Sequence, residues 1–220
     1  MQSLSLHYRE DSFNEDIEPS FKQYLDDNFL KRLDNLDKSN PKILIVFSGG
    51  NSVGKSTLAQ KLGKEFGGLV IENDAVKRIM LEREPELHSN REALSILAWQ
   101  YTMNLYPRLG QFTDNGLVIR DGVIDWYYDR ILPVFEIAGY KLFTIGFDLS
   151  REKAIELIQA RGDTPTVKEK RFYKLLDDHE IHIKRFREQY KLDVTLHDDN
   201  VFDHDLVARK FREFFTNIPR

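Results

Sequence analysis

The stretch KILIVFSGGNSVGKSTLAQKL, residues 42–62, contains the pattern that decides the fold. Its apolar run from Ile43 to Phe47 is typical of a buried strand in a parallel sheet. The residues from Gly49 to Ser56 match G-x-x-x-x-G-K-[ST] without a mismatch, and a helical pattern begins at Lys55. Strand, glycine-rich loop and helix therefore follow one another in the order that this phosphate-binding motif requires.

The residue types of this loop suit a nucleotide. Glycine lets the backbone turn so that its N–H groups face phosphate oxygens, and the N-terminus of the following helix adds its positive dipole end. Lys55 can reach the β- and γ-phosphates, and the Ser56 hydroxyl can ligate Mg²⁺. An ordinary strand-to-helix turn has no need of Lys55 and Ser56 together. We therefore predict a site for ATP and Mg²⁺ whose nucleotide-binding residues are Gly49, Gly50, Asn51, Ser52, Val53, Gly54, Lys55, Ser56 and Thr57.

The rest of the chain alternates between strand and helix patterns. Further strands are predicted over residues 68–73, 116–122, 140–149 and 191–197, with helical patterns between them. This alternation indicates an α/β fold with a doubly wound parallel sheet over residues 41–220. Residues 1–40 are acidic and contain one helical pattern, residues 19–36, so we predict an N-terminal helical extension. That extension either packs on the main domain or contacts a protein partner.

Composition excludes several classes of function. The chain of 220 residues has a net charge of −4 and no cysteine, which rules out disulfides, zinc–thiolate sites and cysteine nucleophiles. The acidic balance argues against nucleic acid as a partner, although a local basic cleft would be compatible with it. The sequence shows no signal peptide and no apolar run of membrane-spanning length, so a cytoplasmic protein is expected.

The motifs beyond the loop separate the kinds of nucleotide-binding protein. A GTPase needs N/T-K-x-D at the end of a strand, and YKLD at 190–193 lacks the leading residue and opens its strand instead. A small kinase would place an acceptor site after the second strand, and there the chain reads IENDAVKRIM, residues 71–80. Here it resembles adenylate-kinase-like P-loop kinases, including zeta-toxin-type kinases, chloramphenicol phosphotransferase and the kinase half of polynucleotide 5′-kinases.

That resemblance implies the P-loop NTPase fold, with three layers and the strand order 2-3-1-4-5. It also implies an ATP-dependent kinase that phosphorylates a hydroxyl of a small molecule, with Asp74 accepting the hydroxyl proton. Asp74 can instead act only as a cap of the next helix. Arg78 would bind an anionic acceptor, whereas the spacing in some of these families selects Lys77; a solvated basic residue is the alternative for either.

Two further regions complete the predicted site. Asp121, at the end of the third strand, lies where the sheet should face its ligand, and it is predicted to hold Mg²⁺ or substrate unless it only forms a turn. The role of the neighbouring Arg120 is open. By resemblance, residues 161–171 form a lid whose Arg161 and Arg171 stabilise the transferring phosphoryl group, and the alternative is a solvated charged segment. The acceptor pocket is expected within residues 74–114.

Other functions remain compatible with this sequence. The loop would also suit an ATPase or a nucleotide-dependent switch that contacts a partner through residues 1–40, and a nucleic-acid 5′-hydroxyl is a less favoured acceptor than a small molecule. His179 and His182, three residues apart in a charged helix, could form a metal pair. No third ligand is indicated, so we predict that they lie on a charged helix surface.

Overall fold

The computed structural model describes residues 41–50, 53–90, 93–94, 97–98, 109, 113, 115–160 and 169–218. The predicted N-terminal extension, most of the acceptor region beyond residue 90 and the first part of the lid lie outside these described residues. Asn51, Ser52 and Arg161 are also outside them. In the described ranges, no helix is both long enough and apolar enough to cross a membrane.

The centre of the protein is a parallel sheet of five strands in the order β2-β3-β1-β4-β5. The strands are β1 (Ile43–Ser48), β2 (Leu69–Glu72), β3 (Leu117–Val123), β4 (Lys141–Phe147) and β5 (Val194–Leu196). Every neighbouring pair is parallel. The predicted fold class and strand order are therefore confirmed.

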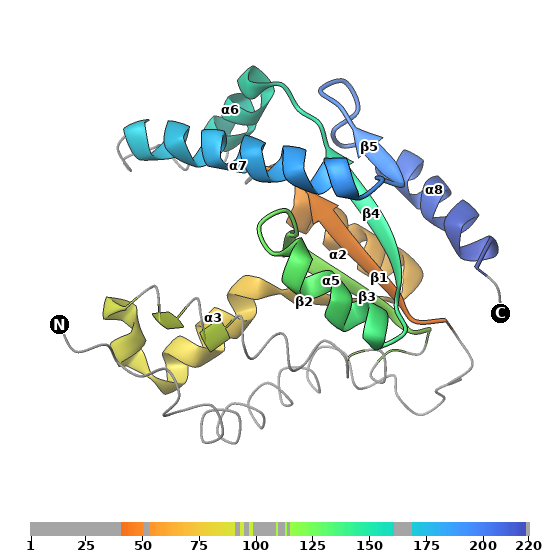
Figure 1. Ribbon diagram of the computed structural model, residues 1–220, viewed down its shortest axis with the longest axis horizontal. Coiled ribbons are helices and arrows are strands. Elements are labelled where there is room, and N and C mark those ends of the chain that lie inside the picture. The colour runs from red at the N-terminus through yellow and green to blue at the C-terminus, as the bar shows by residue number, and fades with distance from the viewer. Residues whose placement is uncertain are drawn as a thin grey trace.

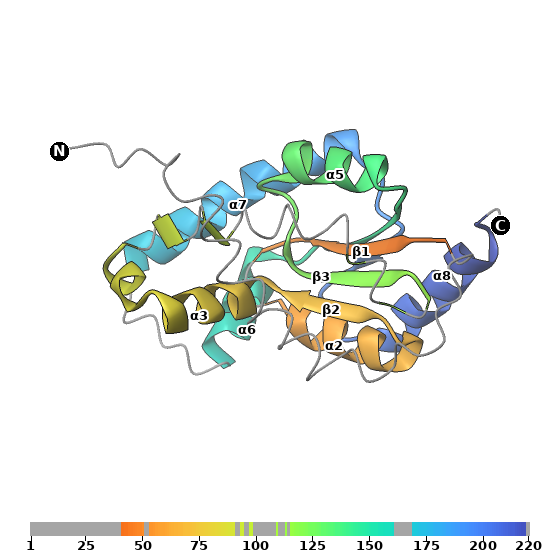
Figure 2. The same ribbon diagram turned by 90° about the horizontal axis from the view of Figure 1, so that it is seen from below.

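Helices cover both faces of this sheet and form three layers (Figures 1 and 2). They are α2 (Lys55–Phe66), α3 (Asn73–Arg83), η3 (Pro85–Ser89), α5 (Tyr128–Ile137), α6 (Arg151–Ala160), α7 (Glu169–Gln189) and α8 (His204–Thr216). Figure 2 shows α5 and the end of α7 on one face, with α2 and α8 on the other. Each face has its own hydrophobic cluster: Phe135 and Phe186 are buried on the first, and Phe143 and Phe211 on the second.

The strand β3 departs from regular pairing near its carboxyl end. Ile45 of β1 pairs with Ile119, but Phe47 pairs with Val123, so β3 uses two residues more than β1 over this interval. Its pairing with β2 continues without a break, with Glu72 opposite Asp121. Such bulges re-aim side chains and are frequent beside functional sites.

The buried side chain of Arg120 lies within this bulge. It is 3% exposed, and its Nη1 donates a hydrogen bond to the carbonyl of Val123 at 3.1 Å. Its Nε has no hydrogen-bond partner within the described part of the chain. Arg120, whose role the sequence left open, therefore bonds to the backbone that forms the bulge.

Candidate nucleotide site

The loop after β1 and the start of α2 form the phosphate site predicted from the sequence. Gly49 has φ +136°, and a Cβ there would lie 2.8 Å from Cβ of Phe147, so only glycine fits. A Cβ at Gly50 would meet no atom of the described residues within 4 Å. Gly54 is the residue before α2, whose first residue is Lys55. The helix N-terminus therefore points at the loop, as an anion site requires.

Lys55 is largely buried and lies over the loop. Only 7% of it is exposed, and its Nζ donates to the carbonyl of Gly49 at 3.3 Å and to that of Gly50. These carbonyls hold the ammonium group beside the place where phosphates would bind. Val53 is buried, and Thr57 is exposed on the first turn of α2.

Ser56 and Asp121, both predicted Mg²⁺ ligands, lie next to each other. Ser56 Oγ donates to Asp121 Oδ1 at 3.1 Å, although 65 residues separate them in the chain. A hydroxyl and a carboxylate at the carboxyl end of a parallel sheet are oxygen donors of the kind that Mg²⁺ prefers. The donor set thus fits a magnesium ion bound with nucleotide phosphates.

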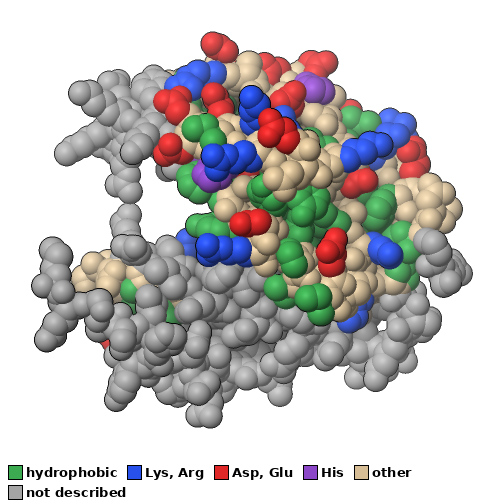
Figure 3. Space-filling view, in the orientation of Figure 1, with side chains coloured by type: hydrophobic (Ala, Val, Ile, Leu, Met, Phe, Trp, Pro, Cys, Tyr) green, Lys and Arg blue, Asp and Glu red, His purple; other side chains and the backbone are tan. Residues whose placement is uncertain are grey.

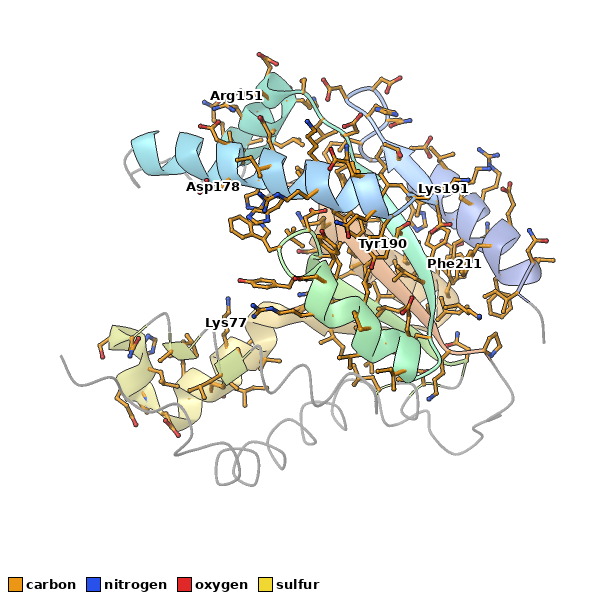
Figure 4. All side chains as sticks on the ribbon, viewed as in Figure 1. Lys77, Arg151, Asp178, Tyr190, Lys191 and Phe211 are labelled. Atoms are coloured by element: carbon orange, nitrogen blue, oxygen red, sulfur yellow. The ribbon has the colours of Figure 1, made fainter. Side chains whose placement is uncertain are left out.

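The predicted acceptor residues come from the helix that follows β2. Asp74 is the second residue of α3. This helix begins directly after Glu72, which pairs with Asp121. Lys77 is half-buried and Arg78 is exposed. Figure 4 shows Lys77 directed from α3 towards the space beneath α7. In Figure 3 the surface is hollowed between the part of the molecule that contains α3 and the part that contains α7.

The remaining lid residue, Arg171, lies near the beginning of α7. The far end of this helix is fixed to β4 through Arg187, whose Nη2 donates to the carbonyl of Phe147 at 2.9 Å and whose Nη1 pairs with Asp148 at 2.5 Å. Arg151 in α6 bonds α7 as well, through Asp177 at 2.8 Å. The helix is therefore anchored at its middle and at its far end, while the roles of Arg161 and Arg171 stay predictions.

Sequence reasoning missed two residues that lie against the loop. Asp125, in the turn after β3, is fully buried and accepts the N–H of Gly49 at its Oδ2, at 2.8 Å. Phe202, in the loop after β5, is 65% exposed, and its ring lies 3.4 Å from the position of a Cβ on Gly54. An exposed aromatic ring beside a phosphate loop is a candidate contact for a nucleotide base. The sequence holds no signal for either contact, because both join segments far apart in the chain.

The prediction for His179 is wrong. The residue is not on a charged surface but 5% exposed, and it accepts a hydrogen bond from Nε1 of Trp126 at 3.4 Å. His182 stacks on the same indole, with ring centroids 4.0 Å apart. Helical spacing places both imidazoles on one side of α7, and that side packs on Trp126. Within the described residues, no group of three or more His, Cys, Asp or Glu side chains could hold a metal ion.

Burial gives His179 an unusual acidity. Desolvation lowers its pKa from 6.5 to about 4, the charges of Lys55 and His182 act in the same direction, and Asp178 opposes them. Between those two pH values the unfolded chain binds more protons at this residue than the folded chain does. Protonation of His179 therefore does not lower the free energy of unfolding above pH 6.5, and it lowers that free energy progressively as the pH falls towards about 4.

We expect His179→Gln to flatten this pH dependence, because glutamine can accept the indole N–H but does not titrate. Urea unfolding across the range from 6.5 down to about 4 measures the free energy of unfolding. The exposed His88, changed to Gln, is the matched control. An unchanged slope in His179→Gln would show that this imidazole is not kept neutral by the fold.

A cavity of about 490 Å³ lies away from the loop, between the ends of α2 and α8. Its lining includes Phe66, Phe211 and Leu117, the first residue of β3. It therefore lies at the opposite end of the strands from the phosphate loop, and it plays no part in the candidate site.

Comparisons with known proteins support the fold. No family model matches the chain, and no curated protein sequence matches it. Among solved structures, it is similar to one from the PezAT chromosomal toxin–antitoxin system of Streptococcus pneumoniae, with a TM-score of 0.59 and 16% identity over 87% of this chain and 78% of that one. It is also similar to a candidate kinase from Chloroflexus aurantiacus, with a TM-score of 0.57 and 19% identity over 81% and 98%.

The shikimate kinase of Bacteroides thetaiotaomicron has a TM-score of 0.51 and 16% identity, over 78% of this chain and 98% of that one. At these identities the similarity establishes the fold. It is the P-loop NTPase fold, as the residues of the loop and the alternation of strands and helices implied.

Proposed function

We propose that this protein is an ATP- and Mg²⁺-dependent phosphotransferase that moves the γ-phosphate to a hydroxyl of a small-molecule acceptor. The observation that supports it best is the pairing of Glu72 with Asp121. The helix α3, whose second residue is Asp74, begins directly after Glu72, so its backbone starts next to the strand that carries Asp121, the partner of Ser56. A candidate base, a candidate metal site and a phosphate cradle therefore share one edge of the sheet.

In the proposed reaction, the acceptor hydroxyl oxygen forms a bond to the γ-phosphorus while the bond to the oxygen bridging the β- and γ-phosphates breaks. Asp74 takes the hydroxyl proton, and ADP leaves. Lys55 holds the phosphate charge, together with Arg161 and Arg171 when the lid closes. Mg²⁺ held by Ser56 and Asp121 would neutralise charge on the phosphate oxygens.

The acceptor would bind between α3 and α7. The half-buried Lys77, directed towards that space, supports this residue over the exposed Arg78 as the cation that binds an anionic acceptor. Phe202 would contact the nucleotide base from the other side of the loop. Both assignments follow from where the side chains lie, and each can be tested by substitution once the acceptor is known.

A screen for ADP formation tests this proposal. The full chain is incubated with ATP and Mg²⁺ and a library of hydroxyl-bearing metabolites, with Lys55→Ala as the blank. Slow background hydrolysis that one compound class stimulates strongly is the expected result. Hydrolysis at ordinary kinase rates without any acceptor would contradict the proposal and favour an ATPase or switch.

The metal assignment makes a separate prediction. Ser56→Ala and Asp121→Asn should each raise the Mg²⁺ concentration needed for half-maximal ATP turnover by about tenfold or more, because each removes an oxygen donor of the site. A Mg²⁺ titration of turnover measures this shift. Gln60→Ala is the matched control, since it removes a different α2 hydrogen bond, to Glu72 at 2.7 Å. An unshifted titration in both variants would place the metal elsewhere.

A further inference from the structure

The turn between β3 and α5, residues 124–127, is fixed at the carboxyl end of β1. The N–H of Ile124 donates to the carbonyl of Phe47 at 3.0 Å, and the N–H of Tyr127 closes the turn on the carbonyl of Ile124 at 3.0 Å. Ile124 is fully buried. The two residues between them, Asp125 and Trp126, are therefore held in place by backbone bonds and core packing.

Asp125 reaches from this turn to the first glycine of the phosphate loop. Its Oδ2 accepts the N–H of Gly49, 76 residues earlier in the chain, at 2.8 Å. Gly49 is thus restrained on three sides: Asp125 holds its N–H, Lys55 bonds its carbonyl, and Phe147 packs against its Cα side. The direction in which the chain leaves β1 depends on these restraints.

The buried position of the Asp125 carboxyl group disfavours its charged form. Burial raises its pKa above the ordinary value, while the Gly49 N–H, the nearby Ser48 hydroxyl and the charges of Arg187 and Lys55 act in the opposite direction. The Ser48 hydroxyl and Oδ1 of Asp125 make no hydrogen bond of good geometry within the described residues. The N–H of Gly49 is therefore the donor that bonds to this carboxyl group. A buried carboxyl that bonds only one backbone N–H by good geometry suggests a role in function rather than stability.

Trp126 continues the same turn to helix α7. Its Nε1 donates to Nδ1 of His179 at 3.4 Å, and its ring stacks on His182 with an interplanar angle of 25°. Adjacent residues therefore contact the phosphate loop on one side and, on the other, the helix that follows the predicted lid. A shift of α7 would move Trp126, and through the rigid turn it would move Asp125.

We propose that Asp125 and Trp126 are positioning residues that hold the phosphate loop in its nucleotide-binding shape and link it to helix α7. Asp125 fixes the peptide of Gly49, so that the later N–H groups of the loop converge on the phosphates. Trp126 makes that restraint dependent on the position of α7. The inference rests on the proposed function, because it assumes that the loop binds a nucleotide.

Calorimetric titration of the full chain with Mg²⁺-ADP and with Mg²⁺-AMPPNP tests the proposal. Asp125→Ala should weaken binding about tenfold, since it removes a buried hydrogen bond to the loop. Asp125→Asn should restore most of the affinity, because an amide oxygen can accept the same N–H. Asp129→Asn is the matched control: it makes the same change on the exposed first turn of α5.

Hydrogen exchange of the Gly49 amide separates positioning from simple loss of stability. Asp125→Ala should accelerate that exchange while amides in the centre of β1 stay protected, and Asp125→Asn should keep Gly49 protected. Trp126→Ala should also weaken nucleotide binding, although the contacts of the indole among the described residues are with α7 and not with the loop. Unchanged affinity in Trp126→Ala would remove the link to α7.

The possible failures are distinguishable. If the wild-type chain binds neither nucleotide, the proposed function is wrong. If it binds them and Asp125→Ala binds equally well, the positioning role is wrong while the proposed function stands. Equal losses in Asp125→Asn and Asp125→Ala would assign the effect to charge and overturn positioning through the hydrogen bond.

Discussion

Replacing Lys55 with alanine is expected to reduce phosphoryl transfer by at least about a hundredfold, because removing one preformed donor from a transition state of this kind has that effect. The ammonium group is held beside the loop by the carbonyls of Gly49 and Gly50, so the alanine variant loses a cation that is fixed at the phosphate site. The measurement is acceptor-stimulated release of ADP under saturating Mg²⁺-ATP. Turnover at the wild-type rate would contradict the assignment.

The controls for this prediction separate chemistry from folding. Lys55→Met retains the length and most of the packing of a largely buried side chain, so it should fold even where alanine leaves a cavity. Lys61→Ala removes an exposed lysine from the same helix and should leave turnover unchanged. A loss in both Lys55 variants with normal thermal unfolding would assign the effect to the phosphate site.

Replacing Asp74 with asparagine is expected to slow transfer by about 10²–10⁴-fold and to leave nucleotide affinity unchanged. The N-cap of α3 is Glu72, and Asp74 is the second residue of the helix, so this substitution should leave the start of α3 intact. It therefore tests Asp74 as a proton acceptor without changing the N-cap residue. Turnover is measured with the acceptor found in the screen, and nucleotide affinity is measured by calorimetry.

Two outcomes would contradict this second prediction. Nearly normal turnover in Asp74→Asn would show that Asp74 is not the proton acceptor. A large loss of nucleotide affinity would place the residue at the nucleotide instead of the acceptor. Asn73→Ala is the neighbouring control, because it changes the first residue of α3 without changing the carboxyl group of Asp74.

Much of the fold could be predicted from the sequence, because its signals are local. The apolar run before Gly49, the glycine spacing and the change from strand to helix period identify the loop and the parallel sheet. The pairing of Ser56 with Asp121 could be anticipated as well, since the carboxyl ends of parallel strands meet at one edge. The strand order was inferred from resemblance and agrees with the structure.

The contacts that no sequence pattern predicts are those between distant segments. The helical sequence pattern after the third strand begins at Asp125, but the helix itself begins at Tyr128. Residues 124–127 form a turn first, because the N–H of Ile124 bonds to Phe47 of β1. His179 was placed on the surface because its neighbours in α7 are charged; it is buried because Trp126 packs on it. In both positions a tertiary contact decides the structure against the pattern of the neighbouring residues.

The bulge in β3 also constrains how the length of this segment can change during evolution. The bulge adds an even number of residues to β3 relative to β1. Side chains after the bulge therefore point to the same alternating faces of the sheet as those before it. Asp121 therefore lies on the same face of the sheet as Ile119, which packs on the side of α2, where Ser56 lies. Gain or loss of a single residue between Ile119 and Val123 would exchange the faces of Arg120 and Asp121, whereas changes in pairs would leave the carboxylate facing α2.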